Sequence, residues 1–110
     1  MQQVPQMLVD LFFRVGQACR EADEFLKRKA AVSSPLLLAG LFEEGQTISD
    51  RLATLRAELA GKQDELLAVL KGFNAEWEQD LARLETIQQT LSYLQRWQAQ
   101  LQERFVQLAS

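Results

Sequence analysis

The chain has 110 residues, of which 47% are hydrophobic and 25% are charged, and its net charge is −3. This length suits one folded domain, and the composition excludes general disorder. The basic residues are scattered apart from the run Lys27 to Lys29, so the concentrated basic face that nucleic-acid binding requires is missing. One cysteine and no histidine exclude an internal disulfide, histidine-based catalysis and histidine or cysteine-cluster metal sites within this chain.

Residues 4–32 are predicted to form the first helix. Apolar positions there recur at alternating spacings of four and three, and a second row that repeats every seven residues widens the stripe. A stripe of this width is typical of a bundle helix that faces a core. The main row is Val4, Leu8, Leu11, Val15, Ala18, Ala22 and Phe25, and the second row is Phe12, Cys19 and Leu26. We expect Cys19 to be a buried structural thiol, since free cysteine is commonly buried.

Pro35 marks the clearest break in the helical pattern, because proline disfavours helix in the residue before it. The first helix should therefore end by Ser33. Ser34 can then cap a second helix that has Pro35 at its first position. A connection of three or four residues implies that the two helices are antiparallel neighbours.

The second helix is predicted over 35–71, and Gly40 and Gly45 weaken its beginning. The segment Thr47 to Asp50 resembles a capping box, at which the chain would kink or restart. Alternatively, both glycines lie inside one helix and only lower its stability.

An apolar seam runs from Ile48 to Leu108 with a mean spacing of about 3.5 residues, which keeps one stripe facing a partner helix. The stretch Lys71 to Asn74 indicates a helix end at Gly72 and a third helix over 74–109. The competing interpretation is one unbroken helix from Pro35 to Leu108, about 110 Å long. Continuity of the seam slightly favours the unbroken helix.

These patterns predict an all-α protein whose residues 1–110 form a single helical domain. Two architectures stay open: an antiparallel helical hairpin, or an elongated three-helix bundle with coiled-coil packing. The first helix is too short to cover the stripe of an unbroken second helix. In that case, a partner chain or a second copy would cover the remainder.

No chemistry-bearing motif is evident. The carboxylates lie mainly off the apolar seam, and the glycines match no phosphate-loop spacing. We therefore expect no enzymatic activity, no cofactor and no small-molecule substrate. The uncharged stretch Ala30 to Phe42 is too short to span a membrane, and Met1 to Phe13 does not read as a secretory signal. The expected location is the cytoplasm.

The expected function is that of a helical interaction subunit, such as a scaffold, adaptor or tethering component, which assembles with protein partner helices or with copies of itself. The alternative is a small helical chaperone that holds an export or assembly client on residues 36–42. Large apolar and aromatic side chains are typical interface anchors. The candidate partner-binding residues are Leu36, Leu37, Leu41, Phe42, Trp77, Leu91, Tyr93, Leu94, Trp97 and Phe105.

Two blocks in the last predicted helix carry a resemblance to a known family. They are Trp77-Glu78-Gln79-Asp80-Leu81 and Leu84-Glu85-x-Ile87-x-x-x-Leu91-Ser92-Tyr93-Leu94. They are similar to the N-terminal helical part of Golgi-to-ER vesicle-tethering subunits of the Dsl/NRZ type. The resemblance implies a helix that pairs with a tethering partner through an extended coiled coil.

Overall fold

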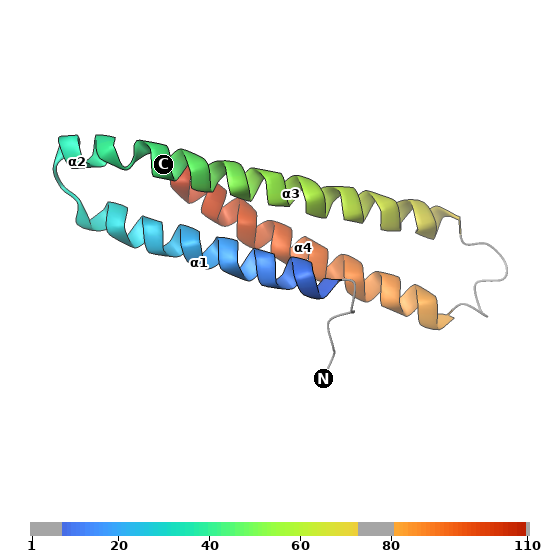
Figure 1. The fold of residues 1–110 in the computed structure, drawn as a ribbon. Coiled ribbons are helices and arrows are strands. Elements are labelled where there is room, and N and C mark those ends of the chain that lie inside the picture. The colour runs from blue at the N-terminus through green and yellow to red at the C-terminus, as the bar shows by residue number, and fades with distance from the viewer. Residues whose placement is uncertain (1–7, 73–80, 110) are drawn as a thin grey trace.

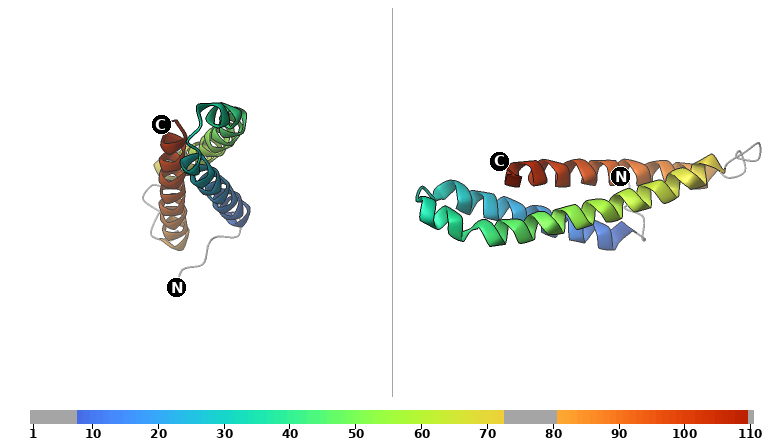
Figure 2. Two further views of the ribbon diagram at one scale, coloured as in Figure 1. Left: turned by 90° about the vertical axis from the view of Figure 1, so that its left-hand side faces the viewer. Right: turned by 90° about the horizontal axis from the view of Figure 1, so that it is seen from above.

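The computed structural model describes residues 8–72 and 81–109, and the regular structure within these ranges is helical (Figure 1). In chain order its helices are α1 (Val9–Ala31), α2 (Pro35–Gly40), α3 (Phe42–Lys71) and α4 (Leu81–Ala109). The three long helices lie together as a rod, with α3 antiparallel to both α1 and α4 (Figure 2). The predicted all-α class is confirmed.

The single helix predicted from Pro35 to Leu108 is wrong. Helices α3 and α4 lie side by side in opposite directions, and the longest dimension of the molecule is 63 Å (Figure 1). The apolar seam could not reveal this reversal of direction. In a hairpin the seams of the two helices keep the same spacing as in one long helix, and they face each other. The helix end predicted at Gly72 is confirmed, since α3 ends at Lys71 and the Gly72 N–H donates to the Val69 carbonyl oxygen at 3.0 Å. The cap predicted at Asn74 lies outside the described residues.

The predicted break between the first two helices is confirmed. Helix α1 ends at Ala31, after which Val32 adopts an extended conformation (φ −96°, ψ 124°). The Ser34 hydroxyl oxygen accepts a hydrogen bond from the Leu37 N–H at 3.5 Å, which caps α2. Pro35 occupies the first turn of α2, where its missing N–H leaves no acceptor unsatisfied.

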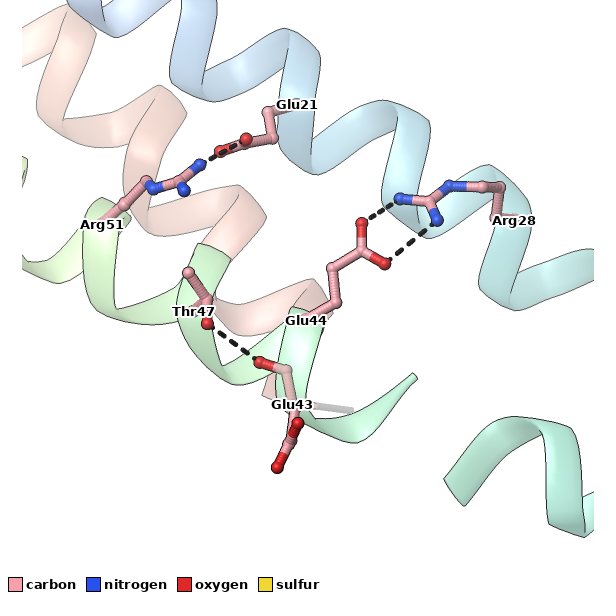
Figure 3. Close-up of polar contacts among 6 residues, drawn as sticks. All are labelled: Glu21, Arg28, Glu43, Glu44, Thr47 and Arg51. Carbon is pink, nitrogen blue, oxygen red and sulfur yellow. Dashed lines mark hydrogen bonds and ion pairs between the residues drawn. The ribbon is translucent and has the colours of Figure 1, made fainter. Parts of the chain in front are cut away.

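The helix predicted over 35–71 is divided, but at Leu41 rather than within Thr47 to Asp50. Leu41 separates α2 from α3, and its half-buried side chain packs against the core. Thr47 lies inside α3, where its hydroxyl donates to the Glu43 carbonyl oxygen at 3.1 Å (Figure 3). A hydroxyl that bonds back to the preceding turn is not a helix cap, so the capping-box interpretation is wrong.

One hydrophobic core joins α1, α3 and α4. Its residues follow the predicted stripes. Complete burial of a valine, leucine, isoleucine or phenylalanine side chain stabilises the fold by about 1.5–3 kcal/mol. The buried set is Leu8 just before α1, Leu11, Val15, Cys19, Ala22 and Phe25 from α1, Ile48, Leu52, Leu55 and Leu59 from α3, and Leu94, Trp97 and Leu101 from α4. Residues 4–7 of the predicted first helix lie outside the described part of the chain.

Helices α1 and α3 are aligned by three ion pairs, which we call the ion ladder: Arg14 with Glu58, Glu21 with Arg51, and Arg28 with Glu44. The last two appear in Figure 3. Successive pairs are seven residues apart along both helices, and the sign alternates. Sliding α1 by seven residues in one direction would place Arg14 opposite Arg51, and in the other Glu21 opposite Glu58. The ladder therefore favours one alignment of the two helices.

The side chains of the ladder are exposed to solvent. The hydrogen bond from Arg14 lowers the pKa of Glu58 below its ordinary value of 4.5, and Arg28 does the same for Glu44. A lowered folded-state pKa means that the stabilisation is complete above the ordinary value. It is lost as the pH falls through the lowered pKa.

Helix α4 is tied to the other two helices by separate polar contacts. Arg104 pairs with Asp23 of α1 at 3.2 Å, and Gln98 donates from its side-chain amide to the Gln63 side-chain oxygen of α3 at 2.7 Å. These contacts flank the core seam, so each pair of long helices is bonded by side chains as well as by packing.

Candidate protein-interaction surfaces

Within residues 8–72 and 81–109, no three His, Cys, Asp or Glu side chains gather as they would around a metal ion. An open groove of about 670 Å³ lies between α1 and α3, lined in part by Arg14, Glu21 and Arg51. These side chains already bind carboxylates or guanidinium groups in the ion ladder. The groove therefore presents charges that are already paired within the ladder.

Cys19 is buried in the core, as the sequence predicts. Burial is the main cause that raises the pKa of its thiol above the ordinary value of 9.0. The thiol is therefore protonated at neutral pH, and its reactivity is that of a structural cysteine.

The leucine tip, defined as Leu36, Leu37, Leu38 and Phe42, lies at one end of the molecule, where α2 links α1 to α3 (Figure 1). Leu36 is 81% exposed and Phe42 is 70% exposed. Leu37 is exposed as well, so three of the predicted partner-binding residues in this segment are accessible, and the fourth, Leu41, faces the core. Consecutive helical residues point in directions roughly 100° apart, so the tip is convex.

The predicted partner-binding residues of α4 serve mainly the chain's own core. Leu94 and Trp97 are buried in it, while Leu91 is half-buried. Phe105 is half-buried beneath the Arg56 guanidinium, whose central carbon lies 5.6 Å from the ring centroid. The aromatic seam that suggested an interface with another chain is thus occupied by α1 and α3. The predicted residue Trp77 lies outside the described residues.

Tyr93 belongs to a second surface, the aromatic patch, defined as Phe12 and Phe13 of α1 with Tyr93 and Trp97 of α4. Ring centroids are 5.6 Å apart for Phe12 and Phe13, 6.0 Å for Phe12 and Trp97, and 5.7 Å for Tyr93 and Trp97. Trp97 is the buried floor, Tyr93 is half-buried, and Phe12 and Phe13 are 46% and 64% exposed. The patch therefore joins two helices and presents aromatic faces to solvent.

Two arginines border the aromatic patch. The Arg96 guanidinium carbon lies 5.5 Å from the centroid of the Tyr93 ring. On α1, Arg20 folds back over Gly16, where its Nη1 lies 3.4 Å from the position that a Cβ of residue 16 would take. Both arginines are exposed.

The sequence did not identify this patch as a site. Phe12 matched the wide apolar stripe of the first predicted helix, and Phe13 matched no stripe. A signal was present, because adjacent phenylalanines on a helix point roughly 100° apart and one core face cannot bury both. What the sequence could not show is that α4 places Trp97 against Phe12.

No described helix combines the length and the hydrophobicity that crossing a bilayer demands. Comparisons with protein-family models, with curated proteins and with solved structures found no match to this chain. The similarity of residues 77–94 to vesicle-tethering subunits therefore stays a prediction. Residues 77–80 of that segment lie outside the described ranges, and within the remainder Ile87 and Leu94 are buried.

Proposed function

We propose that this chain is a non-enzymatic interaction subunit, which binds a partner helix along the aromatic patch. The observation that carries the proposal is the exposure of Phe12 and Phe13 beside a buried tryptophan. Aromatic side chains and arginines are the residue types most enriched at the energetic centres of protein interfaces. The patch has this composition.

The geometry supports a helical partner. Helices α1 and α4 run in the same general direction (Figures 1 and 2), and Phe12 of α1 meets Trp97 of α4 at the patch. A partner helix that contacts both of these helices would carry its apolar anchors at spacings of three and four residues.

The proposed setting is the cytoplasm, where a single buried thiol persists in reduced form. Assembly with a tethering partner is the form of this function that the resemblance of residues 77–94 implies. The chaperone alternative also stays a prediction. The surface expected for it, the leucine tip, is convex, whereas a chaperone that encloses a client helix offers a groove.

Site-specific photo-crosslinking tests the proposal. Phe13 is replaced by benzoylphenylalanine, which keeps an aromatic ring at the exposed position. The matched control carries the same group at Ala57, an exposed position on α3. We expect crosslinks from position 13 to one amphipathic segment, identified by mass spectrometry, and none to that segment from position 57. Substitution Phe13→Asp should abolish the association without changing the circular dichroism spectrum.

The same experiment can contradict the proposal. The proposal fails if positions 13 and 57 give the same crosslinking pattern while light scattering shows a monomer at all concentrations. Trp97→Asp would be a poor substitute for Phe13→Asp. Trp97 is buried, and a buried carboxylate would unfold the bundle rather than probe a contact.

A further inference from the structure

We propose that the partner segment is acidic, and that Arg20 and Arg96 bind carboxylates on either side of its apolar anchor. This inference rests on the proposed function, because it specifies the partner chemistry of the same surface. It assigns the aromatic patch a ligand class: an amphipathic segment whose apolar side chain meets the aromatic rings and whose flanking positions carry Asp or Glu.

The two arginines lie on the same helices as the aromatic patch, Arg20 on α1 and Arg96 on α4. Around the axis of α1, each residue advances by roughly 100°, which places Gly16 and Arg20 between Phe12 and Phe13. The Arg20 side chain covers Gly16 and so extends toward the phenylalanines. Arg96 lies against Tyr93 on the other helix. The patch thus has one cation from each of the two helices that form it.

These two cations have no ionic partner within the described part of the chain. Four other arginines pair with a carboxylate of another helix: Arg14, Arg28, Arg51 and Arg104. Arg20 and Arg96 form no such pair with any described residue. In a chain with more acidic than basic residues, two arginines beside one aromatic patch, without an ionic partner among the described residues, are a site for external carboxylates.

The aromatic rings and the arginines contribute differently to binding. An aromatic anchor supplies affinity to any apolar partner, so it does not by itself select one. A guanidinium group beside a ring binds a carboxylate in a fixed fork geometry and repels a lysine. The exposed arginines therefore act mainly on specificity. Exposed ion pairs each change affinity by a few-fold at most, so two of them predict a preference of roughly threefold to thirtyfold.

The test titrates the 15N-labelled full chain with three synthetic helical peptides of about 18 residues. All three carry the same leucine face, and they differ only at two flanking positions, which hold Glu, Gln or Lys. We expect the Glu peptide to bind at least threefold more tightly than the Gln peptide, and the Lys peptide more weakly than both. The side-chain Nε–H signals of Arg20 and Arg96 should shift on binding, while those of Arg28 and Arg51 stay in place as internal controls.

Variants complete the test. The double variant Arg20→Gln with Arg96→Gln should bind the Glu and Gln peptides equally. The matched control, Lys27→Gln with Lys62→Gln, removes the same charge elsewhere and should keep the preference. Equal affinity of the unaltered chain for the Glu and Gln peptides overturns this inference but leaves the proposed function standing. Absence of binding by all three peptides overturns both. Self-association through the patch, without peptide binding, overturns the acidic partner alone, because a second copy of the chain then occupies the patch.

Discussion

At the scale of single residues, Gly45 shows how a small side chain sets the distance between helices. A Cβ at this position would lie 3.0 Å from one atom of the Phe25 ring and 3.2 Å from another. Phe25 is buried, so neighbouring side chains restrict its movement. The sequence indicates that Gly45 weakens a helix, but it does not show that the glycine makes room for a ring of α1.

The substitution Gly45→Ala should therefore lower the free energy of unfolding by about 1–3 kcal/mol, because the new methyl group overpacks the core. Gly61→Ala is the matched control, since it lies in the same helix with nothing within 4 Å of the new Cβ. It should raise the free energy of unfolding by about 0.5–1 kcal/mol through helix propensity alone. Chemical denaturation measures the free energy of unfolding of both variants. A stabilising effect of Gly45→Ala would show that the Phe25 ring moves aside at little energetic cost.

At the scale of elements, α1 and α3 have two sources of alignment. Their apolar stripes bring the helices together, but repeating stripes fit equally well after a shift of seven residues. The alternating charges of the ion ladder remove that ambiguity, since every such shift juxtaposes like charges.

Reversal of the central pair tests the ladder. Arg51→Glu should lower the midpoint of thermal unfolding, because Glu21 would then face another carboxylate. Adding Glu21→Arg should restore most of the loss, since the pair is re-formed with opposite polarity in mid-helix, away from helix dipoles. Calorimetry at low and high salt measures the effect, which should shrink as salt screens the charges. A double variant no more stable than Arg51→Glu alone would mean that the Glu21–Arg51 ion pair does not contribute to stability.

At the scale of the whole molecule, the chain folds back on itself because two long helices bury more apolar surface together than apart. The sequence did predict the elements on either side of each break, since Ser34, Pro35 and Gly72 are strong local signals. It did not decide the reversal after α3. A seam with a period of about 3.5 residues is satisfied equally by a hairpin and by one long helix.

Solution scattering distinguishes the two shapes directly. We expect a rod with a longest dimension close to 63 Å, the value for the folded hairpin with α1 alongside. An unbroken helix from Pro35 to Leu108 would instead require about 110 Å. A pair-distance distribution that extends past about 100 Å in a monodisperse monomer would restore the long helix and contradict the packing of α3 against α4.

The candidate site was less predictable than the fold, because it depends on which apolar faces the rest of the molecule covers. Leu36, Leu37 and Phe42, which the sequence places in one local apolar run, are exposed among the described residues. Leu94 and Trp97 were assigned to a partner, yet α1 and α3 bury them. Periodicity shows that a face is covered, but not whether the covering helix belongs to the same chain.

The ion ladder has a consequence for how this sequence can change over generations. A single reversal of charge at position 14, 21, 28, 44, 51 or 58 leaves two like charges face to face, whereas a paired reversal restores attraction. An uncharged intermediate such as glutamine at one position connects the two states without repulsion. Descendants of this chain should therefore show positions 14 and 58, 21 and 51, and 28 and 44 exchanging sign in step within each pair.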